Sequence, residues 1–228
     1  MIKKRTLIIM VCIVVLYSGS GFAGLDITTE GNYFKDSQGR TIMFRGVNVG
    51  GSNKVPYQPD GATYIQKNFF QHRDVSFVGR PFPLEKADEH FSRLKQWGLK
   101  LIRLPVTWEA IEHDGPGQYD EEYLDYLYKL VKKANEHNLL VFIDPHQDVW
   151  SRWTGGDGAP GWTLEKLGIK LENLPKTEAA LTHQSKGKPI PRMWLTNYTK
   201  YGAATMFTLF FGGNDFAPQT KIDGVPVQ

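Results

Sequence analysis

The sequence has a single cysteine, Cys12, and lacks the short motifs that mark common nucleotide and zinc sites. It contains no GxxxxGK[ST], no GxGxxG and no paired CxxC, so nucleotide-binding and zinc-ribbon classes have no support. Cys12 lies within an apolar N-terminal stretch. A chain cleaved after that stretch would have neither a thiol nor a disulfide, and its stability would come from packing.

The charge balance gives no support for a nucleic-acid partner. The formal net charge is +3, and three basic residues, Lys3, Lys4 and Arg5, stand at the extreme N-terminus. Removal of that end brings the net charge to zero, so the composition gives no indication of nucleic-acid binding. Hydrophobic content of 41% and charged content of 22% are ordinary for a globular protein, whereas aromatic content of 13% is high.

Residues 1–23 have the pattern of a secretory signal peptide. A basic start precedes an apolar run over Leu7–Tyr17, and small residues at Gly21 and Ala23 favour cleavage after Ala23. We therefore expect a secreted or periplasmic protein. The alternative is an uncleaved anchor, although the apolar run is short for a bilayer span of about 20 residues.

Residues 139–148 combine a strand pattern with a cluster of polar groups. Leu139–Ile143 is apolar on both faces, as in a parallel strand covered on each side. Asp144, His146 and Asp148 share one parity, so they project to one face if the chain stays extended, and Pro145 suits a strand that is ending. Such polar strand ends build the sites of α/β enzymes. The alternative is a helix N-cap followed by a surface loop.

The flanking sequence alternates strand and helix patterns. Residues 27–45 predict a hairpin with a turn at 35–40, and Leu99–Trp108 predicts a second strand. Apolar spacings of three and four predict helices over Pro83–Trp97 and Asp120–Asn138. This order predicts a parallel sheet with right-handed crossovers, in a barrel with its site at the carboxyl ends of the strands or in a doubly wound open sheet.

Four of the six tryptophans fall within a long segment, residues 149–196, that has no clear period. Long segments of this kind are usually functional or disordered, and disordered segments are poor in tryptophan. The rings either form a binding wall or anchor the segment as a local core. Ala203–Phe211 is apolar enough for a short buried helix, and we expect no strand after it.

Four segments together resemble glycoside hydrolase family five, the cellulase-like clan, and within it the endoglycoceramidases: 44–51, 101–109, 144–148 and 208–213. The resemblance runs from about Tyr33 to the last residue. It implies a (β/α)8 barrel that hydrolyses O-glycosyl bonds of a β-linked glycan or glycolipid with retention and without a cofactor. The implied partner is a glycan or glycosphingolipid, with transient contact to a membrane surface.

The resemblance also implies roles for individual residues. Arg103 and Asn48 would support the active site, with a structural ion pair as the alternative for Arg103. The implied sugar-binding residues are Lys54, His146 and Asp148, and Trp150 of the tryptophan-rich segment is a further candidate for substrate binding. A buried histidine without a ligand is the alternative for His146, and no metal is implied.

The sequence departs from the family in its catalytic residues. Retaining glycosidases use two carboxyl groups, which this family supplies as glutamates after the fourth and seventh strands, the first within Asn-Glu-Pro. No Asn-Glu-Pro occurs here. Glu109, Asp144 and Asp148 are carboxylates at predicted strand ends, but the family does not use those positions as its pair.

We therefore expect residues 24–228 to be the N-terminal part of a barrel domain, about the first three βα units, without either catalytic glutamate and inactive alone. Open sheet edges would favour association, and Arg103 would lack its carboxylate partner. One alternative is a non-catalytic carbohydrate- or glycolipid-binding remnant. Another, a metal hydrolase that uses His146 and Asp148, lacks support because the histidines show no HExxH spacing.

Overall fold

The computed structural model describes residues 27–185, 194–222 and 224–226. The predicted signal peptide lies outside this part of the chain. The strands are β1 (Thr28–Glu30), β2 (Tyr33–Lys35), β3 (Thr41–Ile42), β4 (Gly46–Asn48), β5 (Leu101–Thr107), β6 (Leu140–His146), β7 (Lys221–Ile222) and β8 (Val225–Pro226). The α-helices are α1 (Ala87–Gln96), α2 (Trp108–Glu112), α3 (Glu121–Glu136), α4 (Trp162–Glu165), α5 (Asn173–Lys176), α6 (Tyr201–Phe207) and α7 (Gly213–Phe216). Short 3-10 turns are η1 (Ser52–Lys54), η2 (Gln66–Asn68), η3 (Leu84–Lys86), η4 (Arg152–Thr154) and η6 (Trp194–Thr199), and η7 (Thr208–Gly212) is a π-helical turn.

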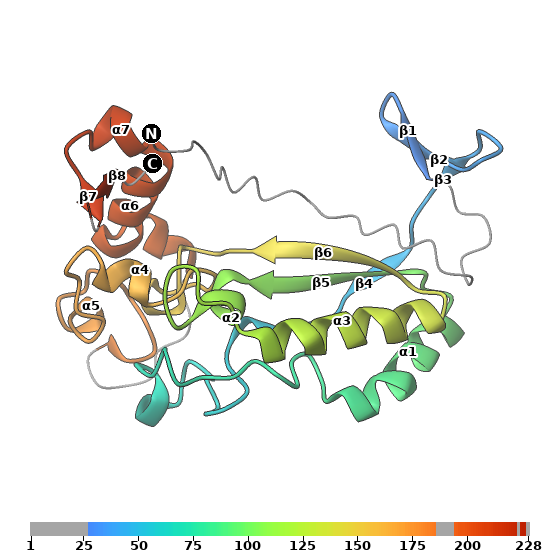
Figure 1. Ribbon diagram of the computed structural model, residues 1–228, viewed down its shortest axis with the longest axis horizontal. Helices are drawn as coiled ribbons and strands as arrows, with labels where there is room; N and C mark the ends of the chain where they lie inside the picture. The colour runs from blue at the N-terminus through green and yellow to red at the C-terminus, as the bar shows by residue number, and fades with distance from the viewer. Residues whose placement is uncertain (1–26, 186–193, 223, 227–228) are drawn as a thin grey trace, which may run out of the picture.

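A parallel sheet of β4, β5 and β6, in chain order, forms the centre of the fold. Helices α1 and α3 contact each other and cover the same face of the sheet (Figure 1). A doubly wound sheet places helices on both faces, whereas a barrel keeps them all outside. The arrangement is one sector of a (β/α)8 barrel, with the uncovered face corresponding to the barrel interior.

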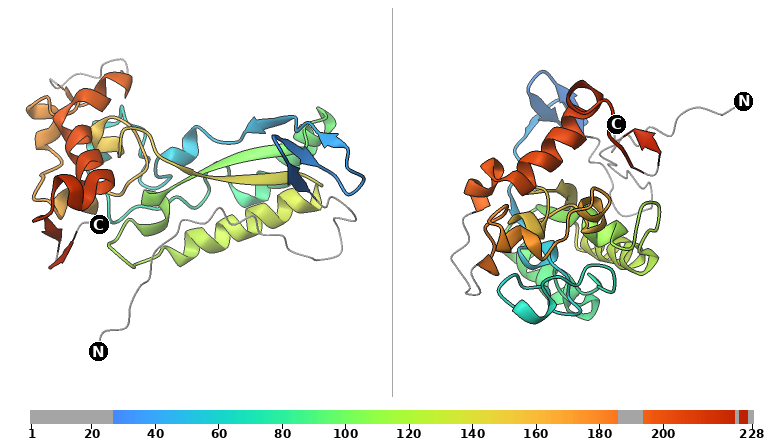
Figure 2. Two further views of the ribbon diagram at one scale, coloured as in Figure 1. Left: turned by 90° about the horizontal axis from the view of Figure 1, so that it is seen from above. Right: turned by 90° about the vertical axis from the view of Figure 1, so that its left-hand side faces the viewer.

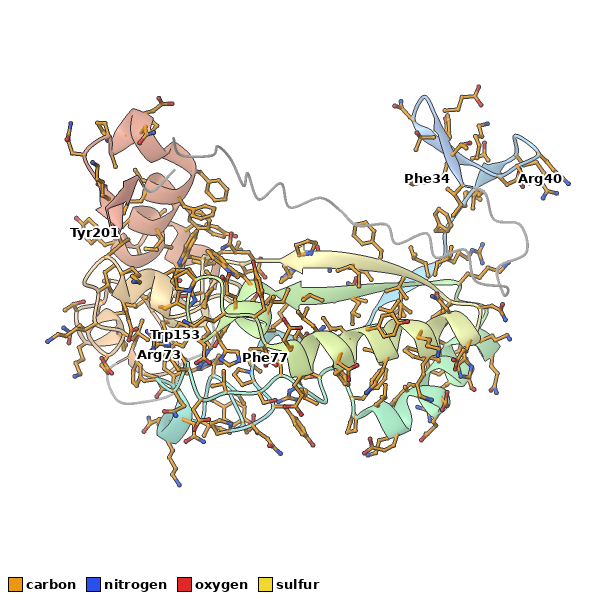
Figure 3. The ribbon with its side chains drawn as sticks, in the orientation of Figure 1. Phe34, Arg40, Arg73, Phe77, Trp153 and Tyr201 are labelled. Carbon is orange, nitrogen blue, oxygen red and sulfur yellow. The ribbon has the colours of Figure 1, made fainter. Side chains whose placement is uncertain are left out.

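The predicted helices are confirmed, with their ends set by local chemistry. Asp120 caps α3 by accepting a hydrogen bond from the Tyr123 backbone N–H at 2.9 Å. The turn η3 leads into α1, which ends just before Gly98, whose φ of 76° suits a glycine after a helix. Buried residues of α1, α3 and the strands, Phe91 of α1 among them, form one core together with Phe77 of the preceding loop, which is labelled in Figure 3.

The two faces of β6 differ as its parity predicts. Val141 and Ile143 pack against the helix-side core, while Asp144 and His146 make their contacts with one another on the other face. The strand ends one residue after Pro145, as expected of a strand that is finishing there, because pairing with β5 continues to His146. Among the described residues β6 is an edge strand, where the missing N–H of a proline is tolerated.

The N-terminal hairpin is a three-stranded antiparallel meander, β1-β2-β3, which stands apart from the parallel sheet (Figures 1 and 3). Phe34 packs edge-to-face on Phe44 at 5.5 Å between ring centroids, and Asp36 closes the turn through an ion pair with Arg40. This unit is largely exposed and lies away from the carboxyl ends of β5 and β6 (Figure 1).

The long segment after β6 folds into a second core. Its buried residues include Trp150, Trp153, Leu164 and Leu174, together with Phe69 from an earlier loop. Figure 3 shows Trp153 inside this part of the molecule. Of the two interpretations for the tryptophans, the local core holds for Trp150, Trp153 and Trp162, which are all buried.

The C-terminal residues add a helical unit at the end of the molecule toward which β5 and β6 point (Figures 1 and 2). The predicted helix over Ala203–Phe211 is present as α6 and η7, but Phe210 and Phe211 are exposed rather than buried. The expectation of no later strand is wrong, since β7 and β8 form an antiparallel pair. Within the described ranges, every helix is too short or too polar to span a bilayer.

Candidate functional site

Asp144, His146 and Asp148 come together at the carboxyl end of β6. The Nδ1 atom of His146 lies 2.8 Å from Asp144 Oδ2, and its Nε2 atom lies 3.1 Å from Asp148 Oδ2. The imidazole therefore lies between two carboxylates, one at each of its nitrogens, and Arg103 Nη2 also lies 3.3 Å from Nδ1. Asp144, His146 and Asp148 form a row on one face because they occupy alternate positions along the chain, as their shared parity predicted.

Arg103 and Asn48 extend the row across the neighbouring strands. The Arg103 guanidinium forms an ion pair with Asp144 at 2.5 Å, and its Nη1 lies 3.4 Å from the Asn48 side-chain oxygen. Asn48 and Arg103 are paired in the sheet, so their side chains share a face. The ion pair considered as the alternative for Arg103 is present, with Asp144 in place of a catalytic glutamate as its carboxylate partner.

Lys54 reaches the same cluster from η1. Its Nζ lies 3.0 Å from Asp148 Oδ2. Burial alone would raise the pKa of Asp148, but hydrogen bonds from Lys54 and His146, and their positive charge, hold it below the ordinary value of an aspartate. Asp148 is thus an ionised acceptor, and about a quarter of its side chain and of the Lys54 side chain is exposed.

Asp157 completes the cluster and was missed by the sequence analysis. Its carboxylate is buried and lies 3.5 Å from Lys54 Nζ and 3.6 Å from His146 Nε2. The residue belongs to the irregular segment after β6, where no strand or helix period indicates which side chains turn inward. The available signal was the run of glycines around it, which marks a tight backbone.

His146, Asp148 and Asp157 can each offer a ligand atom, all within 4.8 Å of one another, and could in principle hold a cation. Lys54 already places an ammonium group against both carboxylates. A metal ion would have to displace the Lys54 ammonium, so these three side chains are better suited to binding Lys54 than to binding a metal ion. The metal-hydrolase alternative gains no support from this geometry.

Glu109, the remaining strand-end carboxylate, is enclosed in the second core. It pairs with Arg152 at 2.9 Å, and both side chains are fully buried. Arg152 also donates to the Phe69 and Gln71 carbonyl oxygens and lies 4.0 Å over the Trp153 ring. Burial raises the pKa of Glu109, and the charge of Arg152 acts against this. The position suits a structural role and gives no access to a ligand.

Trp150, predicted to contact substrate, is also inaccessible. Its ring is 1% exposed, and its indole N–H donates to Thr163 Oγ1 at 3.0 Å. Its neighbour Phe210 does reach the surface: the two ring centroids are 5.0 Å apart, and Phe210 is 40% exposed. An accessible aromatic surface next to Trp150 therefore comes from η7.

The cluster is suited to binding a neutral polyhydroxyl ligand. It offers an ionised acceptor, an ammonium donor and an imidazole, partly exposed at the carboxyl end of a parallel sheet. Sugar hydroxyls both donate and accept, so neighbouring donors and acceptors of this kind can fix one orientation of a ring.

Comparison with known proteins identifies relatives over almost all of the chain. It is 51% identical over 208 residues to a glucosylceramidase of Rhizopus delemar, covering 89% of this chain and 30% of that protein. An endoglycoceramidase I of Rhodococcus hoagii is 30% identical over 149 residues, 65% of this chain and 25% of that protein. The chain thus spans about a third or less of the length of these relatives.

The solved structures agree with this result. A crystal structure of Cryptococcus neoformans sterylglucosidase 1 with tris superposes with a TM-score of 0.83 at 41% identity, over 89% of this chain and 29% of that one. The family model of cellulase, glycosyl hydrolase family 5, matches residues 60–173, half of the 228-residue chain. The chain belongs to glycosyl hydrolase family 5.

Proposed function

We propose that this chain supplies the sugar-recognition end of a retaining glycoside hydrolase that acts on a β-linked glycolipid. The observation that carries the proposal is the Asp148 carboxylate, held by Lys54 and His146 at the carboxyl end of β6. Both hydrogen bonds end on Oδ2, so Oδ1 can accept from a sugar hydroxyl. Arg103 pairs with Asp144, which contacts His146, and Asn48 contacts Arg103, so both residues support the cluster indirectly.

The lipid part of the substrate is inferred from two sources. The relatives include a glucosylceramidase and a sterylglucosidase, whose names share a glucoside and differ in the lipid. On this chain, Phe210 and Phe211 of η7 are partly or largely exposed next to Trp150. We infer that this surface meets the apolar aglycon, and that contact with a membrane is transient and made through the glycolipid.

The catalytic carboxyl pair is not assigned to any residue of this chain. A retaining mechanism needs two carboxyl groups about 5 to 5.5 Å apart, one as acid/base and one as nucleophile. Asp144 and Asp148 are each engaged by cations, and Glu109 is enclosed. We infer that the chain binds a glucoside but does not cleave it, and that hydrolysis requires two glutamates outside these 228 residues.

Titration of the 228-residue chain with methyl β-glucoside, followed by NMR, tests the binding proposal. Asp148→Ala removes a charged acceptor worth about 1.5–3 kcal/mol, which corresponds to an affinity weaker by roughly 10- to 150-fold. Glu165→Ala, in the same segment but paired with His72 and Arg73, is the matched control. Equal affinity of Asp148→Ala and its parent would refute the assignment.

A fluorogenic β-glucoside tests the inference of inactivity. We expect no turnover by the chain alone, because general acid–base help of about 10²- to 10⁴-fold and the nucleophile are both missing. Turnover that Asp148→Ala or Glu109→Ala abolishes would show that the catalytic pair is misplaced.

A further inference from the structure

Asp157 faces the binding cluster without being able to touch a ligand. Its carboxylate is 1% exposed, whereas the side chains of Lys54 and Asp148 remain about a quarter exposed. Lys54 Nζ lies 3.5 Å from Asp157 Oδ2, and His146 Nε2 lies 3.6 Å from Asp157 Oδ1. Asp157 can therefore influence a sugar indirectly, through these two neighbours.

The backbone is built to bring Asp157 to this place. Asp148 and Asp157 exchange two backbone hydrogen bonds, of 3.0 and 2.8 Å. Between them, Val149 and Trp150 adopt φ values of 50° and 74°, which are unusual for a β-branched and a bulky residue. Such conformations cost on the order of 1–3 kcal/mol each and persist only where the surroundings impose them.

Glycine is required where this turn closes. A Cβ on Gly156 would meet the Asp148 carbonyl oxygen and Val149, and one on Gly158, whose φ is +121°, would meet Gln147 at 2.8 Å. The segment thus accepts both backbone strain and close contacts in order to place one buried carboxylate beside Lys54.

We propose that Asp157 is a positioning residue that fixes the Lys54 ammonium against Asp148 and so aligns the sugar-binding groups. Lys54 has four rotatable side-chain bonds, and a single partly exposed ion pair holds such a chain weakly. A second carboxylate, withdrawn from solvent, restricts the ammonium to the position between Asp148 and Asp157. The role as stated rests on the proposed function of this site as a glucoside-binding site.

A double-mutant cycle on the 228-residue chain tests the proposal. Asp157→Asn keeps the side-chain shape and removes the charge, and we expect it to weaken methyl β-glucoside binding about tenfold. If Asp157 acts through Lys54, adding Asp157→Asn to Lys54→Met should weaken binding no further. Glu165→Gln, a carboxylate change elsewhere in the same segment, should leave the affinity unchanged.

Effects of Asp157→Asn and Lys54→Met that add independently would overturn the proposal, as would unchanged binding by Asp157→Asn. If Asp157→Asn fails to fold by near-ultraviolet circular dichroism, Asp157→Ser takes its place in the cycle and the same outcomes apply.

A second readout separates this inference from the proposed function. Restricted motion makes the Lys54 side-chain ammonium observable by NMR in the parent chain without any ligand, and we expect Asp157→Asn to abolish that signal. If the parent chain shows the signal but binds no glucoside, and Asp157→Asn abolishes the signal, the positioning role is upheld and the sugar site is refuted. A signal that survives Asp157→Asn would overturn the positioning role itself.

Discussion

The buried pair of Glu109 and Arg152 gives the sharpest stability prediction. Arg152→Met removes the partner of a fully enclosed carboxylate, and breaking a buried pair in this way costs about 3–5 kcal/mol. It also removes donors to two carbonyl oxygens; the Phe69 oxygen keeps the Trp153 indole N–H at 2.9 Å, while the Gln71 oxygen loses its Arg152 donor. For a chain of this size, the loss corresponds to a melting temperature lower by roughly 6–20 °C.

Comparison of single and double variants separates the charge from the packing. Glu109→Leu combined with Arg152→Met leaves no buried charge, and the Gln71 carbonyl that loses its Arg152 donor belongs to an exposed residue, where water can replace that donor. The double variant should therefore be more stable than Arg152→Met alone. The assay is thermal unfolding followed by near-ultraviolet circular dichroism, to which the buried tryptophans of the second core contribute.

The pH dependence gives an independent check on the same pair. Burial raises the pKa of Glu109, so in Arg152→Met the carboxyl can take up a proton and lose its charge as the pH falls. The penalty of Arg152→Met should be largest at neutral pH and shrink on acidification. Glu109→Gln leaves a guanidinium that cannot be deprotonated, so its penalty should persist. A single variant within about 1 kcal/mol of the parent at all pH values would refute this reasoning.

Three further predictions follow from other parts of the molecule. Burial lowers the pKa of His72 below its ordinary value of 6.5, so the stability contributed by the neutral imidazole is present above pH 6.5 and is lost as the pH falls further. Between about pH 7.5 and 5.5, the melting temperature should therefore fall less steeply in His72→Gln than in the parent. Gly156→Ala should destabilise the chain by about 1–3 kcal/mol and weaken glucoside binding by displacing Asp148, whereas Gly168→Ala, with open space around its Cβ, should cost only strain and leave binding unchanged. The intact mass of exported protein should correspond to cleavage after Ala23, and a mass that retains the leader would contradict the signal-peptide prediction.

The regular part of the fold was predictable because periodicity reports burial directly. The apolar stripes of α1 and α3 and the parity of Asp144, His146 and Asp148 each follow from one repeating geometry. Strand ends were less certain, since β6 continues through Pro145 where an edge position tolerates it. The position of Lys54 next to Asp148, 94 residues away, was not predicted; only the family resemblance indicated that Lys54 belongs to the site.

The irregular segment was not predictable for a physical reason. Tryptophans in a stretch without a period are equally consistent with a binding wall and a core, because both bury flat apolar rings. The outcome depends on partners distant in the chain, such as Phe69, whose carbonyl accepts from Trp153. Asp157 is hidden by the same absence of a period, and only the folded turn shows that it points toward Lys54.

The three strand-end carboxylates show why residue type alone cannot assign a role. Glu109 and Asp148 each pair with a cation near 3 Å, but the Glu109 pair is completely enclosed and the Asp148 pair is about one-quarter exposed. A charge pair without solvent access can only stabilise or destabilise the fold, whereas one at the surface of a strand end can exchange its partners for a ligand. Asp144 lies between these cases, with its carboxylate shared by Arg103 and His146. Burial and partner count, which follow from tertiary contacts, therefore separate the structural carboxylate, the supporting one and the one available to a sugar.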